Sequence, residues 1–206
     1  MERVPCYPSY ILRIQYKLLM RSPYNFIVTP VKNKRYDNST QIGEVDFITS
    51  VSQEDHTSAN RLATVISTPI GYQGEIQKGD TLLVHHNVFK FYYDMYGRQK
   101  SGRSYLKDDH FLVENDQFFL YKNNNKWKAH GKYCFIKPLT LQDSFMYKGG
   151  NEEPLMGEVK YINNELIKLG VKEGDKISFA PDSEYEFKVE GEKLYRMFTK
   201  NITMII

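Results

Sequence analysis

The sequence predicts an all-β protein made of two small β-barrels in tandem. Tyr and Phe are abundant, with 16 and 12 of the 206 residues, and aromatic and β-branched residues favour strands over helices. Three short patterns also recur in the same order in the two halves of the chain. An internal repeat of this kind indicates two copies of one structural unit, and the length allows two domains of about 100 residues each.

The first half reads as strands separated by polar loops. Residues 11–17 alternate apolar and polar side chains, which predicts a strand or an extended arm. The polar residues 32–61 predict a long loop, and Lys78-Gly79-Asp80 predicts a tight turn because Gly accepts positive φ and Asp bonds its own backbone. The strands expected in this half cover residues 25–31, 62–67, 81–85, 88–93, 111–113 and 118–121.

The second half repeats this order with shorter loops. The run 134–139 echoes 26–31 at an offset of about 108 residues, and Glu173-Gly174-Asp175 echoes Lys78-Gly79-Asp80 at about 95. Residues 198–204 echo 113–119 at about 85. The alternative is that two all-β segments share these short patterns by chance. The predicted domains are an N-terminal arm or strand (1–23), a first barrel (24–125) and a second barrel (126–206).

The sequence predicts no enzyme, no cofactor and no metal site. It has no phosphate-binding loop, nucleophile elbow or Cys-x-x-Cys motif. His85 and His86 are adjacent on a predicted strand and therefore face opposite sides, so they do not share a metal ion. Asp108-Asp109-His110 has no matching second cluster, and we interpret it as a solvated strand entry.

Charge and hydropathy point to a soluble, cytoplasmic protein. The net charge of +3, from 28 basic and 25 acidic residues, gives no reason to expect a nucleic acid or membrane partner. No stretch approaches the 18 apolar residues of a membrane span, and polar residues interrupt the N-terminal run, so no secretory signal is expected. Cys6 and Cys134 are far apart and are interpreted as small buried side chains rather than a disulfide.

One basic cluster lies on the Gly-containing hairpin expected at residues 96–107. Arg98, Lys100 and Arg103 would form a positively charged tip there. Such a tip can contact phosphate or an acidic protein surface. The competing interpretation, which we favour, is a solvated loop whose charges serve solubility.

The order of motifs resembles that of the GroES-type co-chaperonins, over roughly residues 24–206. The second repeat carries the closer match, with Val171-Lys172-Glu173-Gly174-Asp175, then Leu194-Tyr195 and a closing strand at 201–205. The first repeat matches more loosely, through Ile27-Val28 and Gly79-Asp80. The resemblance implies small β-barrels with a loop after the first strand that carries a short apolar tripeptide and docks on a chaperonin ring.

The resemblance implies that Val45, Phe47 and Ile48 dock on the ring, since they form the apolar patch inside loop 32–61. Two residues depart from the family pattern. Gly43-Glu44 stands where the family has Gly-Gly, and Asp46 places a charge among apolar side chains. The alternative for residues 45–48 is an ordinary edge strand. In the second repeat, Phe145, Met146 and Tyr147 are either a second anchor or part of the core.

The implied function is a co-chaperonin lid, with a chaperonin ring as protein partner and a homo-oligomeric assembly. The alternative is a non-enzymatic structural or assembly protein, such as a viral capsid or tail component, that uses the barrel for packing; its location would be the virion or the host cytoplasm. A nucleic-acid-binding barrel is third, supported by the aromatic strands and the basic hairpin.

Overall fold

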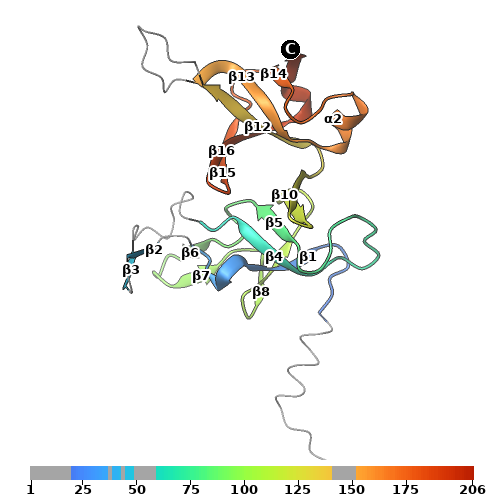
Figure 1. Ribbon diagram of the computed structural model, residues 1–206. Helices are drawn as coiled ribbons and strands as arrows, with labels where there is room; N and C mark the ends of the chain where they lie inside the picture. Colours follow the sequence, from blue (N-terminus) through green and yellow to red (C-terminus); the bar gives the residue numbers. More distant parts are fainter. Residues whose placement is uncertain (1–19, 37–38, 43–44, 49–58, 141–151) are drawn as a thin grey trace, which may run out of the picture. The chain divides into compact units, whose positions relative to one another are not determined.

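The computed structural model describes residues 20–36, 39–42, 45–48, 59–140 and 152–206, with backbone only at 39–42 and 45–48 (Figure 1). Antiparallel strands dominate these residues, which confirms the all-β prediction. The described residues group into two compact units. The first takes those within Met1–Thr81 and His86–Asn115, and the second those within Leu82–His85 and Asp116–Ile206.

In the first unit four strands are neighbours in the order β4-β1-β9-β8. These strands are β1 (Phe26–Pro30), β4 (Leu62–Ser67), β8 (Tyr105–Lys107) and β9 (His110–Val113), and the 3-10 helix η1 covers Val31–Asn33. Two hairpins stand apart from this sheet: β2 (Ser39–Ile42) with β3 (Val45–Ile48), and β6 (Phe91–Tyr93) with β7 (Gln99–Ser101). The core of the unit includes Phe26, Val28 and an edge-to-face pair of Phe89 and Phe111, 4.8 Å between ring centroids.

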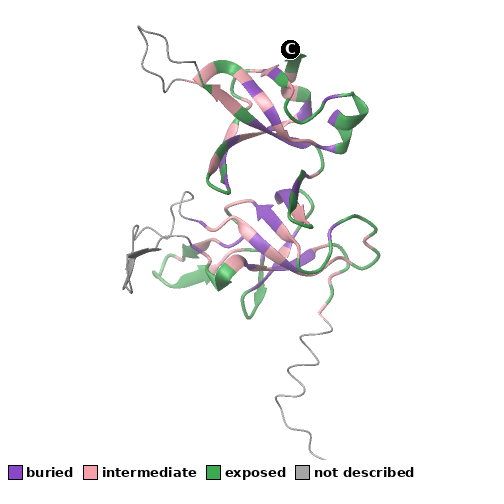
Figure 2. Ribbon diagram, viewed as in Figure 1, coloured by how far each residue is buried: buried purple, intermediate pink, exposed green. Residues whose placement is uncertain are grey.

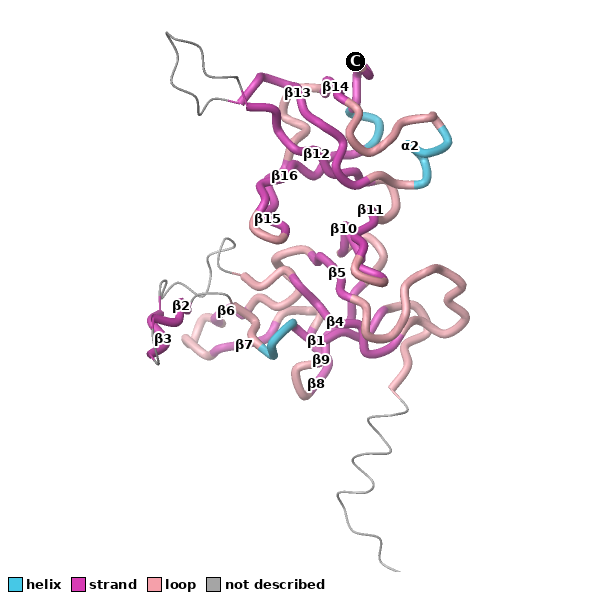
Figure 3. The backbone as a smooth tube through the Cα atoms, viewed as in Figure 1, coloured by secondary structure: helices cyan, strands magenta, loops and turns pink. Residues whose placement is uncertain are grey.

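In the second unit three strands are neighbours in the order β11-β10-β5, and six in the order β15-β16-β12-β13-β14-β17. The first three are β5 (Thr81–Val84), β10 (Phe118–Asn123) and β11 (Lys126–Ala129). The six are β12 (Tyr133–Thr140), β13 (Glu152–Tyr161), β14 (Lys176–Phe179), β15 (Tyr185–Val189), β16 (Glu192–Phe198) and β17 (Ile202–Ile205). The short helix α2 (Asn164–Lys168) follows β13, and the 3-10 helix η2 (Thr199–Asn201) precedes β17 (Figure 3).

The order of strands repeats along the chain. The neighbours β4-β1-β9-β8 correspond to β13-β12-β16-β15, and the pair β10-β5 corresponds to β17-β14. The register repeats as well. Val28 pairs with Val65 after a register shift at Ile27, and Ile136 pairs with Val159 after a register shift at Phe135. We call these two strand sets the first and the second repeat. The register shift stands at the equivalent residue in both, so the two repeats match at the level of single residues.

The Gly-Asp turn of the first repeat ties β4 to the start of β5. Gly79 has φ +96°, which favours glycine, and its N–H donates to the Val65 carbonyl at 2.8 Å. The Val65 N–H donates to the Asp80 carbonyl at 2.9 Å. The Asp80 carboxylate accepts from the Gln77 N–H at 2.8 Å, which closes the turn.

The second repeat makes the same bonds. Gly174 has φ +92° and donates to the Val159 carbonyl at 2.8 Å, and the Val159 N–H donates to the Asp175 carbonyl at 2.9 Å. The Asp175 carboxylate accepts from the N–H of Lys172 at 2.8 Å. The turns predicted at Lys78-Gly79-Asp80 and Glu173-Gly174-Asp175 are therefore confirmed, and they are the same local structure.

The third predicted recurrence, in which residues 198–204 match residues 113–119, is displaced by one residue. Phe26 pairs with Val113, and its counterpart Cys134 pairs with Met197, so Val113 corresponds to Met197 and not to Phe198. A slip of one residue exchanges the two faces of a strand, so the correction decides which side chains enter the core. Met197 is buried against Cys134 and Ile136, as its counterpart Val113 is buried in the first repeat.

None of the sheets formed by the described strands closes into a barrel, and the expected arrangement of two tandem barrels is not confirmed. The predicted domain ranges 24–125 and 126–206 stay a prediction. An aromatic cluster around Phe119 packs β10 against the six-stranded sheet. Its ring lies 5.0 Å from that of Tyr133 and 5.5 Å from that of Phe187, and the Arg196 guanidinium lies 4.6 Å above it.

Candidate functional site

The predicted docking residues Val45, Phe47 and Ile48 lie on β3. This strand pairs antiparallel with β2, with Ile42 opposite Val45 and Thr40 opposite Phe47. The residues are thus carried on a β-hairpin between β1 and β4, a backbone that suits the edge-strand interpretation of residues 45–48. Their side chains lie outside the described part of the chain, and the docking role stays a prediction.

The base of this long loop is closed by hydrogen bonds. Tyr36 and Ala59 form an isolated β-bridge, and the Asn60 N–H donates to the Arg35 carbonyl at 3.0 Å. The Asn60 side-chain amide donates to the Lys34 carbonyl at 2.7 Å. The chain therefore enters and leaves the loop at one place.

Arg35 connects the loop base to its neighbours in the first unit. Its side chain is only 11% exposed, with the guanidinium 4.3 Å above the Phe91 ring and 4.8 Å above the Phe111 ring. It donates to the Asp109 carboxylate from Nε at 3.1 Å and from Nη2 at 2.7 Å, and to the Ser101 hydroxyl at 3.1 Å. Ring stacking and charge-assisted hydrogen bonds both stabilise this position, so one side chain holds the loop base against β6, β7 and β9.

His110 departs from the solvated interpretation of Asp108-Asp109-His110, whereas Asp108 and Asp109 are exposed, as that interpretation expects. Asp109 is engaged with Arg35, and His110 is buried with its Nδ1 2.7 Å from the Asp108 carbonyl oxygen. The Asp-Asp turn takes positive φ at both residues and joins β8 to β9. Asp109 thus pairs with Arg35 beside the loop base while staying exposed to solvent. The sequence alone offered no signal for this, because Arg35 and Asp109 are far apart along the chain.

The predicted basic residues Arg98, Lys100 and Arg103 are all exposed and lie on or next to hairpin β6–β7 (Figure 2). The Asp94 carboxylate shapes the hairpin turn by accepting from the N–H groups of Tyr96 and Arg98, both at 2.9 Å. The basic tip is therefore an ordered turn.

The same hairpin also presents an exposed apolar surface, which the sequence analysis missed because it considered only the basic residues of the hairpin. Met95 is 90% and Tyr96 74% exposed, and Tyr92 and Tyr93 are exposed beside them. The signal was present in the sequence, since these four residues stand within five positions of a Gly turn. Contiguous exposed apolar residues commonly mark a contact surface.

In the second repeat, Phe145, Met146 and Tyr147 lie outside the described residues, and their role stays a prediction. The loop that contains them leaves β12 and returns to β13, where Thr140 pairs with Glu152. The Glu152 carboxylate accepts from Lys193 Nζ at 2.7 Å and from the Tyr195 hydroxyl. Partial burial acts to raise the pKa of Glu152, but these two hydrogen bonds outweigh it and lower the pKa overall.

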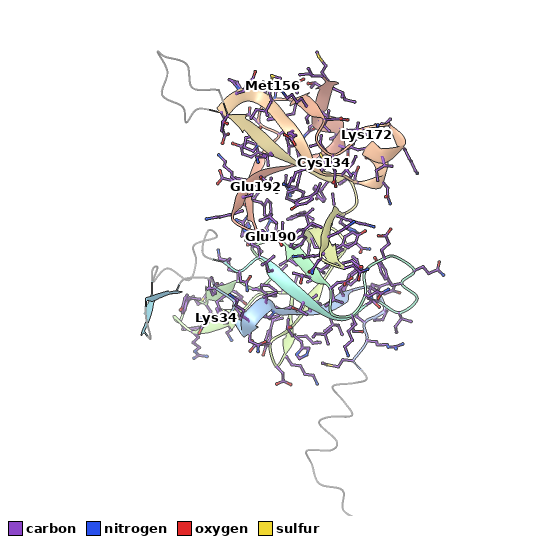
Figure 4. All side chains as sticks on the ribbon, viewed as in Figure 1. Lys34, Cys134, Met156, Lys172, Glu190 and Glu192 are labelled. Carbon is purple, nitrogen blue, oxygen red and sulfur yellow. The ribbon has the colours of Figure 1, made fainter. Side chains whose placement is uncertain are left out.

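Cys134, labelled in Figure 4, lies on β12 and is buried and unpaired with any other cysteine. Burial raises the pKa of its thiol to about 12.

In a Cys6→Ser variant, in which Cys134 is the only thiol, we expect thiol-disulfide exchange about 100-fold slower in the native protein than in denaturant, because the thiolate is the reactive form. The rate of exchange at Cys134 is measured at about pH 8 with a disulfide reagent that releases a chromogenic thiol. A native rate within about tenfold of the denatured rate contradicts the buried position.

Among the described residues, no group of three or more His, Cys, Asp or Glu side chains is placed to hold a metal ion. No helix in the described ranges is long and apolar enough to span a membrane. No protein-family model matches the chain, and no curated protein matches it. The candidate site therefore rests on the chain's own residues: two loops at equivalent places in the two repeats, each with a structured base.

Proposed function

We propose that this protein is a lid for a chaperonin ring and docks through the loop between β1 and β4, which carries Val45, Phe47 and Ile48. The observation that carries the proposal is the repeated placement of the loops. One leaves β1 and returns to β4, and the other leaves β12 and returns to β13, at strands whose register matches residue by residue. The GroES-type resemblance implies a docking loop after the first strand, which is where both stand.

The proposal includes the arrangement as two tandem barrels of GroES type. The equivalent strand orders and the two identical Gly-Asp turns support a duplicated unit. A duplicated unit gives each chain two loops. A short apolar anchor binds weakly by itself because the loop is ordered on binding, whereas several loops on one assembly raise the overall affinity.

A second candidate function is a structural or assembly protein, such as a viral capsid or tail component. The observation in its favour is the apolar tip of hairpin β6–β7, where Met95 and Tyr96 are largely exposed. Permanent assembly would bury such side chains, and this function needs no chaperonin ring.

The test mixes the purified protein with chaperonin rings and ATP and follows co-migration by size-exclusion chromatography. We expect the protein to migrate with the ring. The Phe47→Ala/Ile48→Ala double variant is expected to lose about 100-fold or more in affinity, because each buried apolar side chain contributes about 1.5–3 kcal/mol.

The matched control is Thr40→Ala/Gln41→Ala on β2, the strand that pairs with β3. It removes two side chains of the same hairpin, and ring binding is expected to persist. The proposed lid function is overturned if the protein does not associate with the chaperonin of the organism in which it occurs. Protein found in particles rather than free favours the structural function.

A further inference from the structure

Hairpin β6–β7 has no counterpart among the described strands of the second repeat. In that repeat, residues 180–184 join β14 directly to β15. In the first repeat, residues 85–104 join the equivalent strands β5 and β8, and they contain the hairpin. The second repeat shows that a short turn is enough to connect these strands. The hairpin is therefore an addition to the repeat, and the fold does not require its exposed side chains.

The positive charge of the chain is concentrated around this hairpin. Residues 90–107 contain five basic residues and one acidic residue, so the rest of the chain is almost balanced. The acidic residue is Asp94, whose carboxylate accepts two N–H groups of the turn. Arg98 and Lys100 are exposed, and no acidic side chain of the described ranges forms an ion pair with either. The small net charge of the whole chain does not reveal this concentration.

One face of the hairpin is held against the first unit. The Phe91 ring stacks on that of Tyr36, with 5.9 Å between their centroids, and the Tyr36 hydroxyl accepts from the Phe91 N–H at 2.8 Å. The Arg35 guanidinium lies 4.3 Å above the Phe91 ring and donates to Ser101, the cross-strand partner of Phe91, at 3.1 Å. These contacts fix the hairpin, so the side chains of its other face are presented in a set arrangement.

The other face combines aromatic rings with cations. Because neighbouring residues of a strand face opposite sides, Tyr92 and its cross-strand partner Lys100 lie together on the face away from Phe91. Tyr92 is 50% exposed, and Tyr96 in the adjoining turn is 74% exposed with the Arg98 guanidinium 5.3 Å from its ring centre. We call Tyr92, Tyr96, Arg98 and Lys100 the aromatic–basic patch; each of its rings has a cation beside it.

The composition of the aromatic–basic patch matches the chemistry of single-stranded nucleic acid. Exposed aromatic rings stack on unpaired bases, while neighbouring Arg and Lys side chains contact the phosphates. A duplex keeps its base faces stacked inside and offers nothing to the rings. An acidic protein surface would pair with the cations and leave the rings without a partner. Segments that lie on membranes present Trp, Phe and Leu, and the patch contains none of these.

We propose that the aromatic–basic patch binds single-stranded DNA or RNA, with Tyr92 and Tyr96 stacking on bases and Arg98 and Lys100 contacting phosphates. Such binding tolerates any sequence, because neither contact reads the hydrogen-bonding edges of the bases. The inference goes beyond both candidate functions. It does not depend on a chaperonin ring and involves neither of the two long loops.

The anisotropy of a fluorescent single-stranded oligo(dT) of about 15 nucleotides, titrated with the full chain, tests the proposal. We expect saturable binding, and weaker binding to a duplex of the same length. Tyr92→Ala/Tyr96→Ala is expected to lose about 30-fold or more in affinity, because two base stacks are removed. The matched variant Tyr92→Phe/Tyr96→Phe keeps both rings and is expected to keep binding. Oligo(U) of the same length, titrated in parallel, distinguishes DNA from RNA as the tighter ligand.

The salt dependence tests the role of the cations. Arg98→Ala/Lys100→Ala is expected to reduce the slope of log affinity against log salt by about 1.4, since each phosphate contact on a single strand contributes about 0.7. The control Lys172→Ala/Lys176→Ala removes two exposed lysines of the second repeat and is expected to leave affinity and slope unchanged. An abasic oligomer of the same length is expected to bind the unaltered chain and the Tyr92→Ala/Tyr96→Ala variant equally weakly.

The proposal is overturned if neither oligomer binds at about 50 mM salt, or if Tyr92→Ala/Tyr96→Ala binds as tightly as the unaltered chain. Binding to phosphatidylserine vesicles without binding to either oligomer also overturns it and makes the patch a membrane contact. Urea unfolding followed by Trp127 fluorescence shows that each variant is folded. Loss of ring binding in Phe47→Ala/Ile48→Ala with intact oligomer binding bears on the docking loop only, so the two proposals fail separately.

Discussion

Replacing Phe119 by alanine is expected to lower the free energy of unfolding of the second unit by about 3–5 kcal/mol. Phe119 is buried on β10, and its ring contacts the rings of Tyr133 and Phe187 and the Arg196 guanidinium. Alanine leaves a cavity among three large side chains that β-sheet geometry keeps in place. Phe119→Leu retains most of the volume but loses the ring contacts, so a smaller loss of about 1–1.5 kcal/mol is expected.

Urea unfolding followed by the fluorescence of Trp127 measures this loss. Trp127 is the single tryptophan and lies on β11, beside the altered strand. Tyr24→Ala is the control, since Tyr24 is exposed and should change the stability by less than about 0.5 kcal/mol. A loss under about 1 kcal/mol for Phe119→Ala shows that β10 does not pack on the six-stranded sheet as described.

Arg35→Ala is expected to destabilise the first unit by about 2–3 kcal/mol and to loosen the base of the long loop. The change removes the stacking on Phe91 and Phe111 and leaves Asp109 and Ser101 without the guanidinium. Arg35→Lys keeps the charge but not the planar fork, so it should restore little of the stability. If the lid function holds, both variants also bind the ring more weakly, because the docking hairpin is no longer held at one place.

Hydrogen exchange at Asn60 measures the effect directly. Its N–H donates to the Arg35 carbonyl across the loop base, and we expect faster exchange in both Arg35 variants. Arg103→Ala removes an exposed arginine of the same unit and serves as the matched control. Unchanged exchange at Asn60 in Arg35→Ala means that the backbone bonds alone hold the loop base.

Much of the fold was predictable because its signals are local. The Gly-Asp turns depend on a residue that accepts positive φ and on a carboxylate that bonds its own backbone, and both act over four residues. Period-two alternation and aromatic content likewise predict strands from neighbouring residues. The one-residue error in the third echo arose because register is set by pairing partners far away, which the short pattern does not contain.

The candidate site was predictable only in part. The polar loop with its apolar patch at Val45–Ile48 stands out in the sequence, and the basic residues of hairpin β6–β7 do so as well. The contacts that hold these segments in place cannot be recognised in the sequence. Arg35 reaches Asp109 across a long stretch of chain, and Glu152 meets Lys193 and Tyr195 in the same way. Such contacts exist only after the strands have been brought together.

By itself the sequence determined the all-β class, the two Gly-Asp turns and the order in which strand patterns recur, because these follow from backbone preferences and side-chain alternation over a few residues. Tertiary structure decided the register of β16, the anchoring of both loops and the packing of Phe119, because these depend on which distant strands become neighbours.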